Sequence, residues 1–298
     1  MYIGVLMKSG RESVKNRMEC ITSRTNRWVK LAAQLRKKKY RDKYDMFIME
    51  GIRSAEDLIA QDIRDVICLI SAEDHRMMRM GNIISHGKDL HWLFLQVTFD
   101  ILKDIENTEH GQGIVLLVKK KKTDVQELYQ MKNRFYILLD SIQDPGNLGT
   151  LIRTSAAAGC RGIILTEGCV DPYNEKTVRS SMGSILRIPI YTNLSVSMIK
   201  MIKEKTKLPL IAATLQNAIS YDEIDSIESG IFVFGNEGNG VSDDILNMTD
   251  FNLFIPLAHS VESLNVSAAA AIILFKYVNK VKDKKKYNEV LYGKISHC

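Results

Sequence analysis

Short apolar runs that alternate with helical stretches constrain the fold of this chain more than any other feature of its sequence. In the second half of the chain these runs lie at residues 136–140, 162–166, 208–215, 231–235 and 253–257. Each run is nearly continuous in apolar residues, which is typical of strands that are buried on both faces. Helices between such strands cross over the sheet and cover it. The pattern therefore predicts a parallel α/β sheet with helices on both faces.

Two helices of this half have start and stop signals in the sequence. The first is expected at residues 147–158, because Asn147 can cap its beginning and Gly159 can end it. The last is expected at about residues 263–282, with Ser263 as a candidate cap.

The first half of the chain predicts smaller α/β elements. Apolar residues recur on one face of a helix expected at residues 27–39. Further strands are expected at residues 46–49, 66–71 and 114–118, and further helices at residues 52–61 and from Val97 onward. A chain of 298 residues is long for one domain. The expected division is an extension at residues 1–20, a small α/β domain at 21–120, a linker at 121–133 and a larger domain at 134–298.

Composition excludes several classes of protein. Hydrophobic residues at 45% and charged residues at 26% are ordinary globular values. The longest apolar run, at residues 268–275, is far shorter than the roughly 20 residues of a membrane-spanning helix. An apolar stretch at residues 2–7 precedes the first basic residues, the reverse of the order in a secretory signal, so a cytoplasmic protein is expected. The five cysteines form no C-x-x-C pair and the six histidines do not cluster with them, which favours reduced thiols and no metal site.

Positive charge is concentrated near the beginning of the chain. Residues 1–42 hold twelve Lys and Arg against three acidic residues, and residues 36–41 are the densest part. Further basic runs lie at residues 119–122 and 282–286. Such a run is either a solvated face or a surface that binds the phosphates of a nucleic acid. Trp28 and Tyr40 lie in the same segment and can stack on bases.

Three loops that follow expected strands are rich in glycine, asparagine, serine and acidic residues. They lie at residues 140–150, leading to Arg153, at residues 234–240 and at residues 255–267. Ligands of parallel sheets bind beyond the carboxyl ends of the strands, where these loops fall. Each loop alone is also explained by turn and capping chemistry. None matches a dinucleotide-binding or P-loop pattern.

Taken together, the three loops resemble the signature motifs of the SpoU branch of the SPOUT RNA methyltransferases. The motif N-x-G-x-x-x-R stands at residues 147–153, G-x-E-x-x-G at 235–240, and the Ile-Pro and Ser-Leu-Asn-Val-Ser parts of the third at 255–256 and 263–267. A further family pattern, K-x-x-R-x-S-x-G, matches Lys176, Arg179, Ser181 and Gly183. Upstream, residues 47–51 and 112–114 resemble the substrate-binding domain that is usually fused to this catalytic domain. The resemblance covers about residues 21–280.

The resemblance implies a fold and an activity. The larger domain would be a parallel α/β sheet whose C-terminal part is threaded as a deep trefoil knot, and the smaller one an RNA-binding, ribosomal-protein-like α/β domain. The cofactor would be S-adenosylmethionine, and the protein a homodimer. The reaction would be 2′-O-methylation of a ribose in RNA.

The resemblance also implies roles for single residues. In the family, the arginine that matches Arg153 contacts the RNA phosphate and ribose, and its expected role here is to position the ribose and stabilise the developing alkoxide. Asn147 and Glu237 would orient the substrate, and Ser263 and Asn265 would hydrogen-bond the ribose or Arg153. Backbone groups of Gly235, Ile255 and Leu264 would hold the cofactor. The expected RNA-binding residues are Arg36, Lys37, Lys38, Lys39, Arg41 and Arg179, and no metal is expected.

Three functions remain open at this point. The leading one is methylation of ribosomal RNA, most simply 23S rRNA, because the fused domain and the basic segment suit a folded target. Methylation of tRNA and a non-catalytic role in RNA binding or ribosome assembly are the alternatives. A nucleotide-dependent dehydrogenase is disfavoured by the missing fingerprint.

Overall fold

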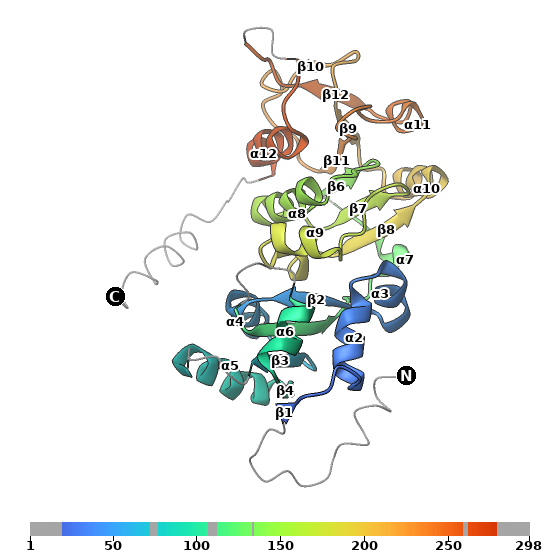
Figure 1. Cartoon of the computed structure of the whole chain (residues 1–298). Helices are drawn as coiled ribbons and strands as arrows, with labels where there is room; N and C mark the ends of the chain where they lie inside the picture. Colours follow the sequence, from blue (N-terminus) through green and yellow to red (C-terminus); the bar gives the residue numbers. More distant parts are fainter. Residues whose placement is uncertain (1–19, 72–76, 107–111, 133, 259–261, 279–298) are drawn as a thin grey trace. The chain divides into compact units, whose positions relative to one another are not determined.

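The computed structural model describes residues 20–71, 77–106, 112–132, 134–258 and 262–278. The expected extension at residues 1–20 lies almost entirely outside them. The chain divides into two compact units after Lys119. Each unit has its own sheet (Figure 1). Each also has its own apolar core.

The first unit is built on a mixed five-stranded sheet in the order β1-β4-β3-β5-β2, in which β5 runs antiparallel to β3 and β2. Helices α2 and α6 pack on one face of this sheet, where their apolar side chains join the core. Its strands are β1 (Cys20–Ile21), β2 (Met46–Glu50), β3 (Ile67–Ser71), β4 (Leu93–Val97) and β5 (Ile114–Lys119). Its helices are α2 (Arg27–Leu35), α3 (Lys38–Tyr44), α4 (Ile52–Ala60), α5 (Met77–Asp89) and α6 (Phe99–Ile105).

Two expectations for this unit were wrong. The helix expected at residues 27–39 is two helices, because the buried Arg41 guanidinium turns back and donates to the carbonyls of Leu35 (2.8 Å) and Arg36 (2.7 Å) at the end of α2. These bonds satisfy carbonyls that a helix end leaves without partners. Val97 does not begin a helix but ends β4, and α6 begins after Thr98.

The second unit is built on a seven-stranded sheet in the order β10-β12-β9-β11-β6-β7-β8. All its neighbouring strands are parallel, which confirms the fold class predicted from the apolar runs. The trefoil knot stays a prediction. The strands are β6 (Phe135–Leu139), β7 (Ile163–Thr166), β8 (Ile190–Leu194), β9 (Leu210–Ala213), β10 (Ile219–Ser220), β11 (Gly230–Phe234) and β12 (Phe251–Phe254).

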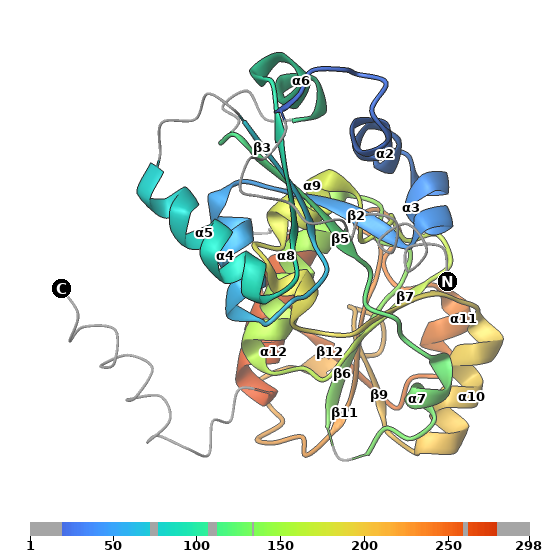
Figure 2. The same ribbon diagram turned by 90° about the horizontal axis from the view of Figure 1, so that it is seen from below.

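Helices lie on both faces of this sheet. In Figure 2, α8 and α12 lie on one face, and α7, α10 and α11 lie on the other. Helix α9 packs beside α8. The helices are α7 (Val125–Leu128), α8 (Pro145–Ala158), α9 (Glu175–Ser180), α10 (Val196–Thr206), α11 (Asp243–Leu246) and α12 (Val266–Tyr277), with a 3₁₀ turn at Ser184–Leu186.

The starts of α8 and α12 differ from the expected ones. Helix α8 is capped by Asp144, whose side chain accepts from the Asn147 N–H, and Pro145 takes the first helical position. It ends at Gly159, as expected, with a φ of 93°. Helix α12 is capped by Asn265 and not by Ser263. Residues 279–282 of the expected last helix lie outside the described residues.

Gly149 lets α8 and α9 approach closely. A Cβ at this position would lie 2.5 Å from the Ser180 Cβ and 2.5 Å from the Thr177 carbonyl oxygen. The second contact is with backbone, so the helices would have to move apart. Glycine at this motif position therefore has a packing role.

We expect Gly149→Ala to lower the free energy of unfolding by about 1–3 kcal/mol, the usual cost of overpacking. The measurement is urea unfolding of the full chain. The control is Gly81→Ala in α5, where a Cβ would meet nothing within 4 Å. Alanine is the better helix former, so that variant should be as stable as the wild type or slightly more so. Equal stability of the two variants would contradict the packing role.

The described residues include neither a helix long and apolar enough to cross a membrane nor a group of three or more metal-ligating side chains. Cys20, Cys68, Cys160 and Cys169 are free thiols.

Candidate functional site

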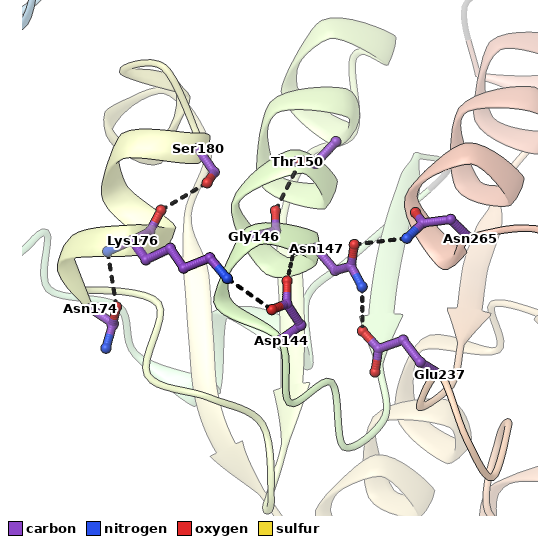
Figure 3. Close-up of polar contacts among 9 residues, drawn as sticks. All are labelled: Asp144, Gly146, Asn147, Thr150, Asn174, Lys176, Ser180, Glu237 and Asn265. Carbon is purple, nitrogen blue, oxygen red and sulfur yellow. Dashed lines mark hydrogen bonds and ion pairs between the residues drawn. The ribbon is translucent and has the colours of Figure 1, made fainter.

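Three side chains from three distant segments meet at the carboxyl edge of the second sheet. The Asn147 Nδ2 donates to Glu237 Oε1 at 2.7 Å, and the Asn265 Nδ2 donates to Asn147 Oδ1 at 3.0 Å. Figure 3 shows Asn147 between the other two. We call Asn147, Glu237 and Asn265 the polar cluster. It contains one residue from each of the three motif loops.

The main chain at Asn147 is also held. Its N–H donates to Asp144 Oδ1 at 2.8 Å, and its carbonyl accepts from the Ser267 hydroxyl at 3.3 Å. On the other side, Asn265 Oδ1 accepts from the Ser267 N–H at 2.9 Å. Asn265 thus caps α12 with its oxygen and contacts α8 with its nitrogen, so the first turns of the two helices are joined.

The loop that carries Glu237 is closed by Asn236. The Asn236 Oδ1 accepts from the N–H groups of Gly238 (2.8 Å) and Asn239 (3.2 Å), and its Nδ2 donates to the Ser141 carbonyl at 2.9 Å. The backbones of Asn236 and Gly240 exchange two hydrogen bonds of 2.9 Å. These bonds fix the turn at whose tip Glu237 lies exposed.

Gly235 lies where this loop begins. A Cβ there would lie 2.1 Å from the Gly240 carbonyl carbon, so no other residue allows the loop to close in this way. The buried Asp140 ties the same loop to the sheet, because its Oδ2 accepts from the Ser242 N–H at 2.8 Å and its Oδ1 from the Thr166 hydroxyl at 3.0 Å.

A pocket of about 150 Å³ lies at the same edge of the sheet, beyond β9 and β12. Its lining is mostly apolar and includes Ile255, Ser263 and Leu264. Because Leu264 and Asn265 are neighbours in sequence, this pocket adjoins the polar cluster. A second pocket, of about 410 Å³, lies beside Pro209 and Asp250, at the opposite ends of β9 and β12 and away from the motif loops.

The Asp144 carboxylate is held in its charged form. The hydrogen bond from the Asn147 N–H, followed by the one from Lys176, keeps the pKa of Asp144 below its usual value. The Lys176 Nζ lies 3.1 Å from Asp144 Oδ2. A negative charge at the beginning of α8 is also favoured by the helix dipole.

The other expected site residues of the second unit fall in two places. Ile255, Ser263 and Leu264 line the pocket, whereas Gly235 is not part of its lining. Arg153 is exposed on α8, and it makes no hydrogen bond or ion pair with another described residue. Arg179 is exposed on α9. The structure does not bring Arg153 or Arg179 into contact with the polar cluster.

The basic segment of the first unit is only partly exposed. Arg41 is buried, and Arg36 donates to the Ile105 carbonyl at 2.7 Å, so both have structural contacts. Lys37, Lys38 and Lys39 are exposed; Lys38 pairs with Asp42, and the Lys39 ammonium lies over the Tyr40 ring. Trp28 is also buried in the core, which removes it as a stacking surface for bases.

Several residues of the site were missed by reasoning from the sequence. Asp144 and Asn236 hold the polar cluster, and Thr214 and Leu215 line the pocket. The signal for Asp144 was present, since Asp followed by Pro is a typical start of a helix. Of the K-x-x-R-x-S-x-G positions, Ser181 donates to the Val178 carbonyl and Gly183 has a φ of 76°, so these two shape the chain after α9.

Such a site can hold a ligand beyond the strand ends and orient a polar substrate beside it.

Both units match known families of domains. Residues 134–275 match the SpoU rRNA Methylase family, and residues 26–116 match the MRM3-like substrate binding domain.

Curated relatives span nearly the whole chain. The 23S rRNA (guanosine(2553)-2′-O)-methyltransferase RlmP of Bacillus subtilis is 32% identical over 87% of this chain and 98% of its own. An uncharacterised tRNA/rRNA methyltransferase of Synechocystis is 32% identical over 86% of this chain and 92% of its own.

Among solved structures, an AdoMet-bound rRNA methyltransferase from Sinorhizobium meliloti superposes with a TM-score of 0.76 and 28% identity. The match covers 87% of this chain and 96% of the other. Family profile, relatives and fold agree with the motif loops gathered at one sheet edge, and the chain belongs to the SpoU rRNA methylase family.

Proposed function

We propose that this protein is an RNA 2′-O-ribose methyltransferase that uses S-adenosylmethionine and acts on ribosomal RNA. The observation that carries the proposal is the polar cluster, which unites the three family motifs at the sheet edge where the pocket also lies. The ribosomal target is supported by the relative from Bacillus subtilis, whose name states 2′-O-methylation of 23S rRNA.

The pocket suits the adenine part of the cofactor, because its walls are mostly apolar. Backbone groups of Ile255 and Leu264 in the lining, and of Gly235 outside it, are the proposed polar contacts of the cofactor. The solved relative from Sinorhizobium meliloti contains AdoMet. When bound, S-adenosylmethionine supplies a methyl group that is already activated by the sulfonium.

The protein must then hold the ribose 2′-oxygen in line and help it lose its proton. Asn147 and Asn265 present amide groups, and Glu237 presents a carboxylate, beside the pocket. We propose that these side chains and Ser263 orient the ribose. The Arg153 guanidinium stabilises the alkoxide that develops on the 2′-oxygen.

We also propose that the protein forms a homodimer. Dimerisation through the second unit is supported by Ile272 and Phe275 on α12, whose side chains are 37% and 46% exposed. The first unit is proposed to bind RNA, consistent with its substrate-binding profile. A cytoplasmic location and the domain limits at residues 120 and 134 stay predictions.

The proposed RNA surface of the first unit is centred on Lys37, Lys38 and Lys39, without the buried Arg41. Arg36 and Arg179 remain proposed RNA contacts. Changing the three lysines to alanine should make RNA binding less dependent on salt. Each phosphate contact on a single strand adds about 0.7 to the log–log slope, so the slope should fall by roughly 2 if all three make contact.

The matched control removes Lys200, Lys205 and Lys207, which lie on or just after α10 in the second unit and lower the net charge equally. Its salt slope should equal that of the wild type. The affinity for S-adenosylmethionine should not change in any of the three proteins. Equal salt slopes for all three would identify residues 37–39 as a solvated face.

The experiment that tests the function is incubation of the full chain with methyl-labelled S-adenosylmethionine and total RNA. Label in rRNA is the expected result. Label in tRNA would move the target, and retained RNA binding without label would favour a non-catalytic role in RNA binding.

A further inference from the structure

Lys176 and Asp144 form an ion pair beside the polar cluster that no step of the proposed reaction uses. The Lys176 Nζ lies 3.1 Å from Asp144 Oδ2, while Asp144 Oδ1 accepts from the Asn147 N–H at 2.8 Å. One carboxylate therefore joins a lysine of α9 to the residue that stands between Glu237 and Asn265 (Figure 3).

The position of Lys176 is itself fixed. Its N–H donates to Asn174 Oδ1 at 2.9 Å, and its carbonyl accepts from the Ser180 hydroxyl at 2.8 Å, so α9 is held at both ends. Helix α9 packs on α8 at Gly149, where there is no room for a Cβ. The lysine thus extends from a rigid base.

The path from Lys176 to Asp144 passes over Gly146. A Cβ on Gly146 would lie 2.9 Å from Asp144 Oδ1 and 3.5 Å from the Lys176 Cε. The bare backbone at this position leaves the space in which the ammonium and the carboxylate meet. The Thr150 hydroxyl donates to the Gly146 carbonyl at 2.9 Å, which further orders this first turn of α8.

Stability does not account for the pair. Its side chains are 56% and 44% exposed, and exposed ion pairs contribute little to folding. What the pair does fix is orientation, because the carboxylate accepts two hydrogen bonds that come from different helices. A rotation of Asp144 would release the Asn147 N–H and change where its side chain points.

We propose that Lys176 is a positioning residue for methyl transfer, which acts through Asp144 to hold Asn147 in the place where it bridges Glu237 and Asn265. This inference rests on the proposed function, since the polar cluster must orient the ribose. Lys176 contacts neither cofactor nor RNA in this role.

The test compares full-length variants in two ways: the single-turnover rate at saturating RNA and S-adenosylmethionine, and KM for RNA from a series of RNA concentrations. Lys176→Met should lower the single-turnover rate about tenfold, because small displacements of an orienting group are costly, while KM for RNA stays unchanged. Lys176→Arg keeps a donor within reach of Asp144 and should restore most of the rate. Asp144→Asn combined with Lys176→Met should be no slower than the slower single variant, because the two residues act in one chain of contacts.

The matched control is Lys203→Met, which removes an ion pair of the same kind (2.8 Å to Asp250) on α10. Its rate should equal that of the wild type. The proposal is overturned if Lys176→Met raises KM for RNA at an unchanged rate, which would make the lysine an RNA contact. It is also overturned if Lys176→Met keeps both values, or if Lys203→Met is equally slow.

A second readout does not depend on activity. Hydrogen exchange at the Asn147 amide, followed by NMR in the full chain, should be faster in Lys176→Met than in the wild type, because the acceptor Asp144 is released. Unchanged exchange would overturn the proposal even if the wild type proved inactive. An inactive wild type with the expected exchange would instead count against the proposed function alone.

Discussion

Arg153→Ala is expected to lower the turnover of the protein at least about 100-fold, the usual loss when a group that stabilises developing charge is removed. The affinity for S-adenosylmethionine, measured by calorimetric titration, should change little, because Arg153 is not part of the pocket lining. The side chain is exposed on α8 and makes no ion pair with another described residue, so its charge is available to a substrate.

The control for this experiment is Arg161→Ala, which removes an exposed arginine of the same unit that belongs to none of the motif loops. Its turnover should be close to that of the wild type. Lost cofactor binding in Arg153→Ala would assign Arg153 to the pocket, and unchanged turnover would remove it from the chemistry.

Asn147→Asp should be nearly as damaging, although it changes the size of the side chain very little. The Nδ2 that donates to Glu237 Oε1 at 2.7 Å would be replaced by an oxygen, and two carboxylates would face each other. Like charges at that distance repel strongly, and the polar cluster should open. We expect turnover to fall about 100-fold, measured under single-turnover conditions.

Two results would identify the hydrogen bond as the cause. A carboxylate that faces a second carboxylate binds a proton more readily than an isolated one. Lower pH should therefore place a proton between the carboxylate introduced at position 147 and that of Glu237, so the rate of Asn147→Asp relative to wild type should rise. Adding Glu237→Gln to Asn147→Asp restores a hydrogen bond with its direction reversed. The amide introduced at position 237 can donate to the carboxylate introduced at position 147. The double variant should be faster than Asn147→Asp alone. A double variant as slow as the single one would contradict the account of the polar cluster.

The central strands of the second unit were predictable because they are buried on both faces, whereas β8 and β10, at the two edges of the sheet, were not predicted. Continuous runs such as residues 231–235 have one plausible environment, and β11 lies there in the middle of the sheet. In contrast, β4 was missed although residues 92–95 form an apolar run, because so short a run can belong to a strand or to a buried helix segment. The end of α2 was missed because it depends on Arg41, whose contact with α2 follows from the folded chain and not from helical periodicity.

The candidate site was predictable only as a set of loops. Motif spacing located Asn147, Glu237 and Asn265, but the bonds among them join residues about 90 to 120 positions apart, which depend on the order of strands in the sheet. Asp144 and Asn147 are both good capping residues, and local sequence favoured the wrong one until Pro145 was placed at the first helical position. The exposed lysines and the buried Arg41 could not be told apart by charge density.

The most direct test of the central claim is to identify the methylated atom. Ribosomal RNA labelled by the full chain is digested to nucleosides, and the position of the methyl group is read by mass spectrometry, with Arg153→Ala as the parallel reaction. The account predicts a single 2′-O-methylated nucleoside, strongly reduced in the Arg153→Ala reaction. A methyl group on a base, or ribose methylation that Arg153→Ala leaves unchanged, would contradict it.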